Sequence, residues 1–318
     1  MKFEEREILR ILRSRSGFVS CSEIANALGV SKALVSKLVN NLRRMGFVIE
    51  SHPRYGYRLL EVDDLSMLSR YPPDVGIPIT VHYLRKCSST QDVAALLAEE
   101  GAEEGTLVVA EEMDKGRGRM GRRWAAPRGG LWFTLVLRPR RLEYLHALSL
   151  CMGVAVARAI RNVTEVGVEL KWPNDVVFQG KKLGGILVEA KVEADVVRYV
   201  LVGVGINVNN ELPPELRGFA VSLREVLGRR VARVPLLRAC ISAMMQYYSF
   251  LRDGKLDKVL KEWRNLSCTL GKRVRVSMID GRSLEGVAED VDDVGRLVLK
   301  LDTGERILID AGDVEHLG

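Results

Sequence analysis

The period of the hydrophobic pattern changes twice along this 318-residue chain, and this restricts its fold more than any other feature. Residues 1–60 repeat apolar side chains at helical spacing. The middle of the chain alternates short apolar strands with amphipathic helices, and from Gly271 onward apolar and polar side chains alternate. Each period needs its own packing arrangement. We therefore predict an α+β multidomain protein.

The expected domains are residues 1–62, 80–268 and 269–318. Between the first two, residues 63–79 show no clear period and contain Pro72, Pro73 and Pro78. Prolines interrupt both helices and strands. This segment is therefore predicted to be a linker.

The first domain has the pattern of a winged helix-turn-helix. A helix is expected to about Arg15, a capping box at Ser20–Glu23 opens a second, and Ser31 caps a third. Alternating residues 47–50 and 55–60 predict a two-stranded wing. The inward positions of the first and third helices are expected to be Ile8, Leu9, Leu12, Leu34, Leu38 and Leu42.

Positive charge is concentrated in this first domain. Residues 1–60 hold 11 Lys/Arg against 5 Asp/Glu, about +6 of the net +7. Such a balance favours a nucleic acid, and one unit would read only a half-site, so operator DNA would require a homodimer. The candidate DNA contacts on the third helix are Ser31, Lys32, Ser36, Lys37, Asn40 and Arg43, with Arg44 beside them. The alternative is a helical protein-interaction domain with a basic face.

Composition excludes several other classes. The five cysteines are scattered with no C-x-x-C pair, which argues for a reducing compartment and against a zinc site. The N-terminus is charged at once, unlike a signal peptide. The longest apolar stretch, residues 145–160, is interrupted by His146 and Arg158 and predicts a buried helix. We expect a cytoplasmic protein without a membrane span.

The stretch Lys115–Trp124, KGRGRMGRRW, is the first functional signal. Its glycines let backbone amides approach a ligand, and its arginines offer planar donor forks that match phosphate or carboxylate oxygens. It lies between an apolar strand at 106–110 and another at 130–137. The pattern predicts a mobile loop that closes over a polyanion; the alternative is a solvated basic loop.

Further polar sets follow other predicted strands. They are Ser88–Thr90 before a helix, KWPND at 171–175, KKLGG at 181–185 and GVGIN at 203–207. Taken alone, each set has an ordinary structural interpretation. In the same order, these are a helix cap, a turn, a hairpin and a weak glycine motif. Together they supply hydroxyls, amides, a lysine and a carboxylate at strand ends, which favours one shared ligand site.

GRGRMGRRW, KWPND, KKLGGILVE and GVGINVN, in this order, closely resemble the biotin protein ligases. The resemblance spans residues 1–318, because the first domain is similar to that of members that also repress biotin genes. It implies a catalytic domain like that of class II aminoacyl-tRNA synthetases and a small SH3-like β-barrel at the C-terminus. It also implies that biotin and Mg-ATP form biotinyl-5′-AMP, which acylates one lysine of a biotin carboxyl carrier protein.

The resemblance also implies residue roles. The biotin contacts would be Ser89, Thr90, Gln91, Met113, Arg117, Gly118, Arg119 and Lys182. The nucleotide contacts would be Arg117, Arg119, Arg122, Trp124 and Asn207. The catalytic residues would be Lys182, Arg119, Asp175 and Lys171, with no metal site built from side chains. Two positions depart from the family pattern: Met113 replaces a common Gln, and Gln91 replaces a common Asn.

Two other functions remain open at this point. One is a DNA-binding sensor of biotin or its adenylate that no longer transfers biotin to a carrier. The other is a lipoate or related acyl-adenylating ligase, which the GRGRMGRRW loop disfavours.

Overall fold

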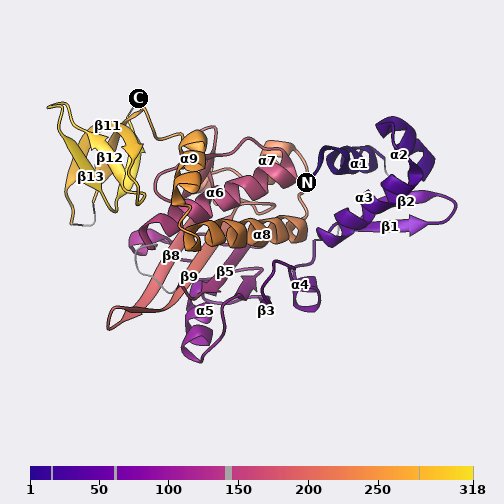
Figure 1. Cartoon of the computed structure of the whole chain (residues 1–318), viewed down its shortest axis with the longest axis horizontal. Coiled ribbons are helices and arrows are strands. Elements are labelled where there is room, and N and C mark those ends of the chain that lie inside the picture. The colour runs from indigo at the N-terminus through magenta and orange to yellow at the C-terminus, as the bar shows by residue number, and fades with distance from the viewer. Residues whose placement is uncertain (16, 61–62, 140–144, 279, 318) are drawn as a thin grey trace.

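The computed structural model describes residues 1–318 except 16, 61–62, 140–144, 279 and 318. Three units follow one another along the long axis of the molecule (Figure 1). The N-terminal helices and wing lie at one end, a large mixed α and β unit lies in the centre, and a small sheet lies at the other end. The α+β fold class is confirmed, and its three units differ in architecture as the changing period predicts.

The N-terminal unit has the expected winged helix-turn-helix order. It consists of α1 (Phe3–Arg13), α2 (Cys21–Leu28), α3 (Lys32–Arg44), β1 (Val48–His52) and β2 (Gly56–Leu60). The side chain of Ser20 accepts a hydrogen bond from the Glu23 amide, and that of Ser31 accepts one from the Leu34 amide. These caps satisfy amides that have no partner within the helix, which explains why both helices begin there.

The prediction that Leu34 of α3 faces the core is wrong. Leu34 is 38% exposed, whereas Val35, Leu38, Val39 and Leu42 are buried. The buried set follows the i, i+3, i+4, i+7 spacing of one helix face, and Leu34 lies at its edge. Ile8, Leu9 and Leu12 are buried as predicted.

The expected linker is partly structured. It contains a short helix, α4 (Met67–Arg70), and the side chains of Leu65 and Leu68 are fully buried. Burial of two leucines anchors a segment that polar composition alone would leave unpacked. The expected boundary at residue 62 falls on residues 61–62, which lie outside the described residues.

The central unit is built on a seven-stranded sheet. Its strands, in spatial order, are β3 (Thr80–Leu84), β4 (Thr106–Ala110), β5 (Leu131–Leu137), β9 (Val196–Ile206), β8 (Lys181–Glu193), β7 (Asp175–Phe178) and β6 (Glu169–Lys171). β3 and β4 are parallel, and every other neighbouring pair is antiparallel. Neighbours in space are therefore often distant in sequence, which allows remote motifs to meet.

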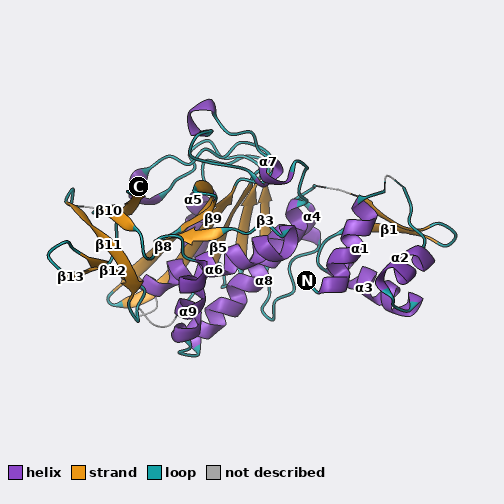
Figure 2. Ribbon diagram, turned by 90° about the horizontal axis from the view of Figure 1, so that it is seen from above, coloured by secondary structure: helices purple, strands orange, loops and turns teal. Residues whose placement is uncertain are grey.

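Helices cover both faces of this sheet (Figure 2). α6 (Leu145–Thr164), α8 (Arg233–Arg252) and α9 (Leu256–Leu266) pack on one face, and α5 (Thr90–Glu99) on the other. Side chains alternate across a strand. Leu107 and Val109 of β4 accordingly join the large core under α6 and α8, while Val108 packs with Ala94 and Ala98 of α5.

α6 is the one described helix long and apolar enough to cross a membrane. In its most apolar window, Ala147–Thr164, 78% of the residues are buried inside the protein. A helix that is apolar on all sides is expected when it lies between a sheet and other helices. This agrees with the predicted buried helix.

The C-terminal unit is a five-stranded antiparallel sheet. Its strands are β10 (Arg273–Ser277), β11 (Ser283–Val291), β12 (Leu297–Lys300), β13 (Arg306–Ile309) and β14 (Asp313–His316), in the order β13-β12-β11-β10-β14. The sequence predicted the first four. β14 was missed because four residues with one buried side chain, Val314, carry little periodic signal.

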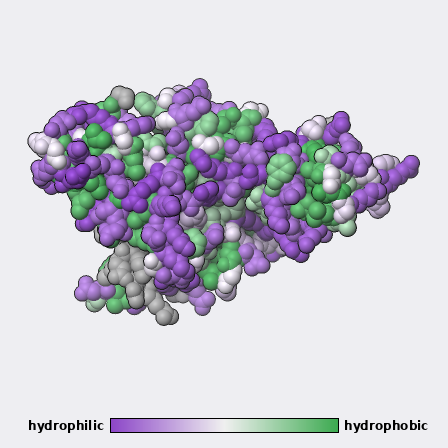
Figure 3. All heavy atoms as spheres, turned by 45° about the horizontal axis from the view of Figure 1, so that its top comes forward, coloured by the Kyte–Doolittle hydropathy of each residue, from purple (hydrophilic) through white to green (hydrophobic). Residues whose placement is uncertain are grey.

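Two motifs do not lie where the sequence placed them. KKLGG lies inside β8 and GVG lies inside β9, whereas both were expected beside shorter strands. The central unit also contains a short helix, α7 (Leu223–Leu227), which opens with a capping box at Ser222 and Glu225. The outer surface seen in Figure 3 is mostly hydrophilic, with apolar residues in separate patches.

Candidate active site

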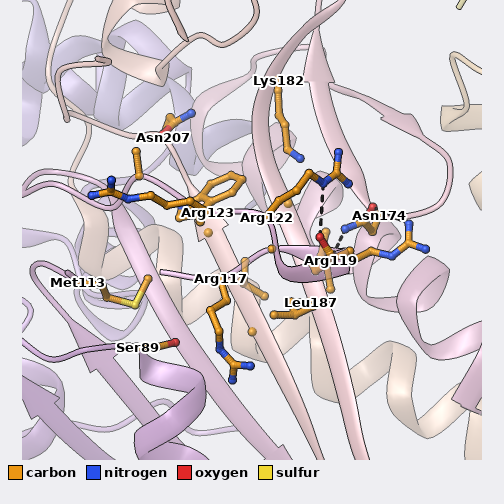
Figure 4. Close-up of a pocket in the computed structure, with 18 of the residues that line it drawn as sticks. Ser89, Met113, Arg117, Arg119, Arg122, Arg123, Asn174, Lys182, Leu187 and Asn207 are labelled. Atoms are coloured by element: carbon orange, nitrogen blue, oxygen red, sulfur yellow. Dashed lines mark hydrogen bonds between the residues drawn. The ribbon is translucent and has the colours of Figure 1, made fainter. Parts of the chain in front are cut away.

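A cavity of about 260 Å³ opens between the start of α5, the 115–124 loop and strands β8 and β9 (Figure 4). In Figure 4, Lys182 lies across this cavity from Ser89 and Met113. The predicted residues that line it are Ser89, Thr90, Gln91, Met113, Arg117, Gly118, Arg119, Arg122, Trp124, Lys182 and Asn207. All the predicted biotin and nucleotide contacts therefore surround one cavity.

The start of α5 forms one wall. Ser89 is the N-cap, and its hydroxyl oxygen accepts a hydrogen bond of 3.2 Å from the Gln91 amide. The Met113 sulfur accepts one of 3.2 Å from the Thr90 amide. The side chains of Ser89, Thr90 and Gln91 are each at least 95% buried. Buried polar groups need partners, so this wall is a built polar surface.

Glycines of β9 make room for two side chains of the site. A Cβ on Gly203 would lie 2.6 Å from Gln91 Oε1, and a Cβ on Gly205 would lie 2.8 Å from the Trp124 ring. Neither distance is compatible with a real side chain. The glycines therefore lie inside a strand because Gln91 and Trp124 pack directly over its backbone.

The loop is held in a defined shape by its own backbone. The Gly118 amide donates to the Arg122 carbonyl at 2.7 Å, and the Trp124 amide donates to the Gly116 carbonyl at 2.8 Å. A Cβ on Gly116 would lie 2.5 Å from the Trp124 carbonyl oxygen. The close approach of these two backbone segments explains the glycine at this position.

The loop arginines reach three different elements. Arg117 forms ion pairs with Asp92 of α5 at 2.7 Å and with Glu189 of β8 at 3.2 Å. Arg119 donates to the Gly312 carbonyl at 3.1 Å, and Arg122 pairs with Asp313 at 2.6 Å. Burial lowers the pKa of the Arg119 guanidinium. The loop thus spans the cavity and contacts the C-terminal unit.

Lys182 is held by a carboxylate and an aromatic ring. Its Nζ lies 2.6 Å from Asp175 Oδ1 and 5.3 Å from the centre of the Trp124 ring. A cation over an indole face is favourable, and the ion pair fixes the amine. A Cβ on Gly185 would lie within 3.6 Å of all three side chains, so this glycine keeps the space between them free.

The structure does not bring Lys171 and Asp175 to the cavity wall. Asp175 pairs with Lys182, which does line the cavity, at 2.6 Å, and Lys171 lies near Cys268 and His316. The neighbouring Asn174 lines the cavity instead, with its amide donating to the Ile186 carbonyl at 2.7 Å.

Sequence reasoning left other lining residues out of the site. Asn174 had a signal, because it belongs to the KWPND turn. Arg123 also had one, inside the basic loop. Phe133, Leu187 and Phe219 had none, since apolar residues in strands and loops are ordinary. Phe219 is 77% exposed at the rim of the cavity.

Asn207 completes the far side of the cavity. Its side chain is buried, and its Oδ1 accepts a hydrogen bond of 3.1 Å from Asn210. The other end of this amide, Nδ2, is a hydrogen-bond donor. Among the described residues, no group of three or more His, Cys, Asp or Glu gathers to hold a metal ion.

Of the predicted DNA-binding residues, Ser31 is the N-cap of α3 and the others lie on α3, which precedes the wing. Lys32, Lys37, Asn40 and Arg44 are exposed. Two others make contacts within the unit: Ser36 Oγ lies 3.0 Å from the Tyr57 hydroxyl, and Arg43 donates to the Ile49 carbonyl at 2.7 Å. Arg43 thus also fastens the wing to α3.

Three family models match the chain. A helix-turn-helix domain matches residues 4–58, the biotin/lipoate A/B protein ligase family matches 83–207, and the biotin protein ligase C-terminal domain matches 269–317. The three matches fall on the three structural units in order.

Whole-chain relatives agree with these models. The chain is 35% identical to the bifunctional ligase/repressor BirA of Bacillus subtilis, over 99% of both chains. It is 35% identical to the biotin--[acetyl-CoA-carboxylase] ligase of Mycobacterium tuberculosis, over 72% of this chain and 86% of that protein. A solved biotin protein ligase from Aquifex aeolicus with biotin and ATP superposes with a TM-score of 0.67 and 30% identity, covering 74% of this chain and 99% of the other.

Proposed function

The chain belongs to the biotin protein ligases that carry an N-terminal helix-turn-helix domain, and we propose that the cavity between α5, the 115–124 loop and strands β8 and β9 makes biotinyl-5′-AMP from biotin and ATP. It is a biotin--[acetyl-CoA-carboxylase] ligase, so a carrier protein is its second substrate. The observation that carries the proposal is the meeting of the α5 start, the basic loop and Lys182 around one cavity.

In the first step, a biotin carboxylate oxygen attacks the α-phosphorus, and the bond from that phosphorus to the pyrophosphate oxygen breaks. Two anions must approach one another while negative charge grows on the leaving group. Lys182, Arg119 and Arg117 are cations at the cavity wall that offset this repulsion. Mg²⁺ would arrive with the phosphates, which supply most of its ligands, and would neutralise the pyrophosphate.

In the second step, the carrier lysine amine attacks the acyl carbonyl, AMP leaves and the amine loses a proton. Biotin would sit against Ser89, Thr90, Gln91 and Met113, and the nucleotide toward Trp124, Arg122 and Asn207. Asp175 would act by positioning Lys182, from which its carboxylate is 2.6 Å distant. A loop that covers the mixed anhydride would also exclude water.

For regulation, we propose that the N-terminal unit binds operator DNA as a homodimer in the cytoplasm and represses transcription when the adenylate is bound. The exposed cations of α3 support DNA contact. We assign residues 1–62 to this domain, 63–79 to the linker, 80–268 to the catalytic domain and 269–318 to the C-terminal domain.

The decisive experiment follows both half-reactions separately. ATP–pyrophosphate exchange that depends on biotin tests adenylation, and streptavidin blotting of a biotin carboxyl carrier domain tests transfer. We expect both to be positive. Exchange without labelling of the carrier would instead identify a sensor, and pyrophosphate exchange that depends on lipoate in place of biotin would contradict the assigned substrate.

A further inference from the structure

A second cavity, of about 240 Å³, lies at the junction between the N-terminal and central units, where α1 faces the C-terminal end of α6 (Figure 1). We call it the junction cavity. It is nearly as large as the ligand cavity of about 260 Å³, and the described linings of the two share no residue. Glu165 is the one acid in its described lining. Four arginines also line it, namely Arg6, Arg10, Arg13 and Arg229.

Three of these arginines form a stripe on one face of α1. Arg6, Arg10 and Arg13 are four and three residues apart, a spacing at which side chains on a helix are neighbours and like charges repel. Arg10 forms ion pairs with Glu7 at 2.7 Å and with Glu165 at 3.2 Å. The negative end of the α1 dipole also favours cations in the last turn, where Arg10 and Arg13 lie. Arg6 lies near the other end of α1, so the dipole gives no reason for its charge.

Arg6 and Arg229 have no carboxylate within ion-pair distance in the described part of the chain. Among the described residues, the Arg6 guanidinium donates only to the Asn162 side-chain oxygen, at 3.4 Å, and that of Arg229 only to the Arg230 carbonyl, at 3.2 Å. The C-terminal end of α6 supplies no more than about half a negative charge against these two cations, so an excess of about 1.5 positive charges remains in the junction cavity.

The two arginines belong to different units. α1 carries Arg6, whereas Arg229 follows α7 in the central unit. A guanidinium presents planar pairs of donors that match phosphate oxygens, and it stays charged at physiological pH. One phosphate compound in the junction cavity would therefore neutralise the excess charge of both units and accept hydrogen bonds from both.

We propose that the junction cavity binds a small, multiply charged phosphate compound, held by Arg6 and Arg229 with Arg10 and Arg13 beside them. This site is separate from the cavity of the proposed function. A DNA backbone carries the same phosphate groups, but the exposed cations that support DNA contact lie on α3, and Arg229 belongs to the central unit. The site is therefore assigned to a free anion.

The test titrates inorganic pyrophosphate into the full-length protein by calorimetry. Pyrophosphate is also the product of the proposed adenylation, so variants of the two cavities are compared. We expect a saturable binding event that persists in Arg119→Ala. Arg6→Gln/Arg229→Gln should weaken this event at least about tenfold, as expected for lost hydrogen bonds between charged groups. Pyrophosphate should also raise the midpoint of thermal unfolding of Arg119→Ala, because an anion that binds only the folded protein stabilises it.

Glu165→Gln provides a readout that a purely structural role of the arginines would not move. It removes the one acid of the described lining, so it should strengthen pyrophosphate binding about three- to tenfold, because a nearby like charge no longer repels the anion. If the junction cavity were only a contact between two units, the same change would break the ion pair with Arg10 and give no gain in affinity.

The matched control is Arg54→Gln/Arg70→Gln, which makes the same change in net charge at exposed positions outside the junction cavity. It should bind pyrophosphate as wild type does. Arg6→Gln/Arg229→Gln should keep the wild-type rate of biotin-dependent pyrophosphate exchange within about twofold, since neither residue lines the ligand cavity. The salt dependence of its binding to a random-sequence DNA duplex should also match wild type.

The absence of saturable binding in Arg119→Ala would overturn the inference, as would an unchanged affinity in Arg6→Gln/Arg229→Gln. A salt slope for DNA that falls by about 2 in this double variant, without a pyrophosphate site, would assign both arginines to DNA and equally refute it. If the double variant does not fold, Glu165→Gln decides, and no gain in affinity there rejects the site. Loss of biotin-dependent exchange in wild type would instead reject only the proposed function.

Discussion

Arg233, at the start of α8, donates to the Asp63 carboxylate over 2.7 Å and so joins the central unit to the connector that follows the N-terminal unit. The guanidinium is 96% buried and also pairs with Glu111 at 2.8 Å. Glu111 lies two residues before Met113 of the cavity. One buried cation therefore holds the connector next to the ligand-binding wall.

Replacing this cation should strongly destabilise the protein. Arg233→Ala removes the buried cation that lies between two carboxylates with little exposure, Asp63 and Glu111, and breaking a buried ion pair in this way costs about 3–5 kcal/mol. Urea unfolding measures the loss. Arg230→Ala is the matched control, since Arg230 contacts the same Asp63 at 3.6 Å but is 65% exposed, and it should cost less than about 1 kcal/mol. Equal losses would contradict the role of burial.

Removing either main cation of the site should abolish most adenylation. Lys182→Ala and Arg119→Ala each remove a charge that offsets the growing negative charge, an effect of about 10²–10³ in rate. Biotin-dependent pyrophosphate release measures it, and circular dichroism should show a retained fold. Lys181→Ala, at the exposed neighbouring position, should keep its rate. Unchanged release in Lys182→Ala or Arg119→Ala would refute the assignment.

A methyl group at Gly203 should weaken biotin binding. The new Cβ would lie 2.6 Å from Gln91 Oε1 and would force the amide to move, at a cost of about 1–3 kcal/mol for overpacking. We expect the KM for biotin to rise at least about tenfold in Gly203→Ala. Gly167→Ala, where a Cβ meets nothing within 4 Å, is the control. The same KM in both variants would show that Gln91 is not held over β9.

Acid should destabilise the protein partly through His316. Burial, then the charges of Lys171 and Lys272, lower the pKa of His316 to about 4. The unfolded side chain titrates near about 6.5, so between these values the unfolded state binds more protons and stability falls as the pH falls. His316→Leu should flatten the decline in unfolding free energy from pH 6.5 to 4. An equally steep decline in the variant would contradict this.

The exposed face of α3 should contribute salt-dependent DNA affinity. Lys37→Ala removes one exposed cation, and a lost phosphate contact should weaken binding on all sequences alike and reduce the salt slope by about 1. Fluorescence anisotropy at several salt concentrations with biotin and ATP present measures both. Lys258→Ala, exposed on α9, should alter neither. A change confined to one base position would assign Lys37 to base reading instead.

Local features were predictable because neighbouring residues decide them. Ser20 and Ser31 cap helices three residues from the amides they accept, and β4 lies within the bounds that its apolar run predicts. The family resemblance likewise rests on contiguous motifs. The ligand-site residues that it implies line one cavity, except Lys171 and Asp175, and their roles stay predictions.

The sequence by itself determined the three units, their helix starts and the chemistry available to the site. Only the tertiary structure decided that Gly203 serves Gln91, that Leu34 faces outward, that Asn174 replaces Asp175 at the wall and that Thr134 lies behind Thr90. Two of these relations join distant residues: Gly203 is 112 positions from Gln91, and Thr134 is 44 positions from Thr90. No local period or cap encodes them, because the order of strands in the sheet brings these residues together.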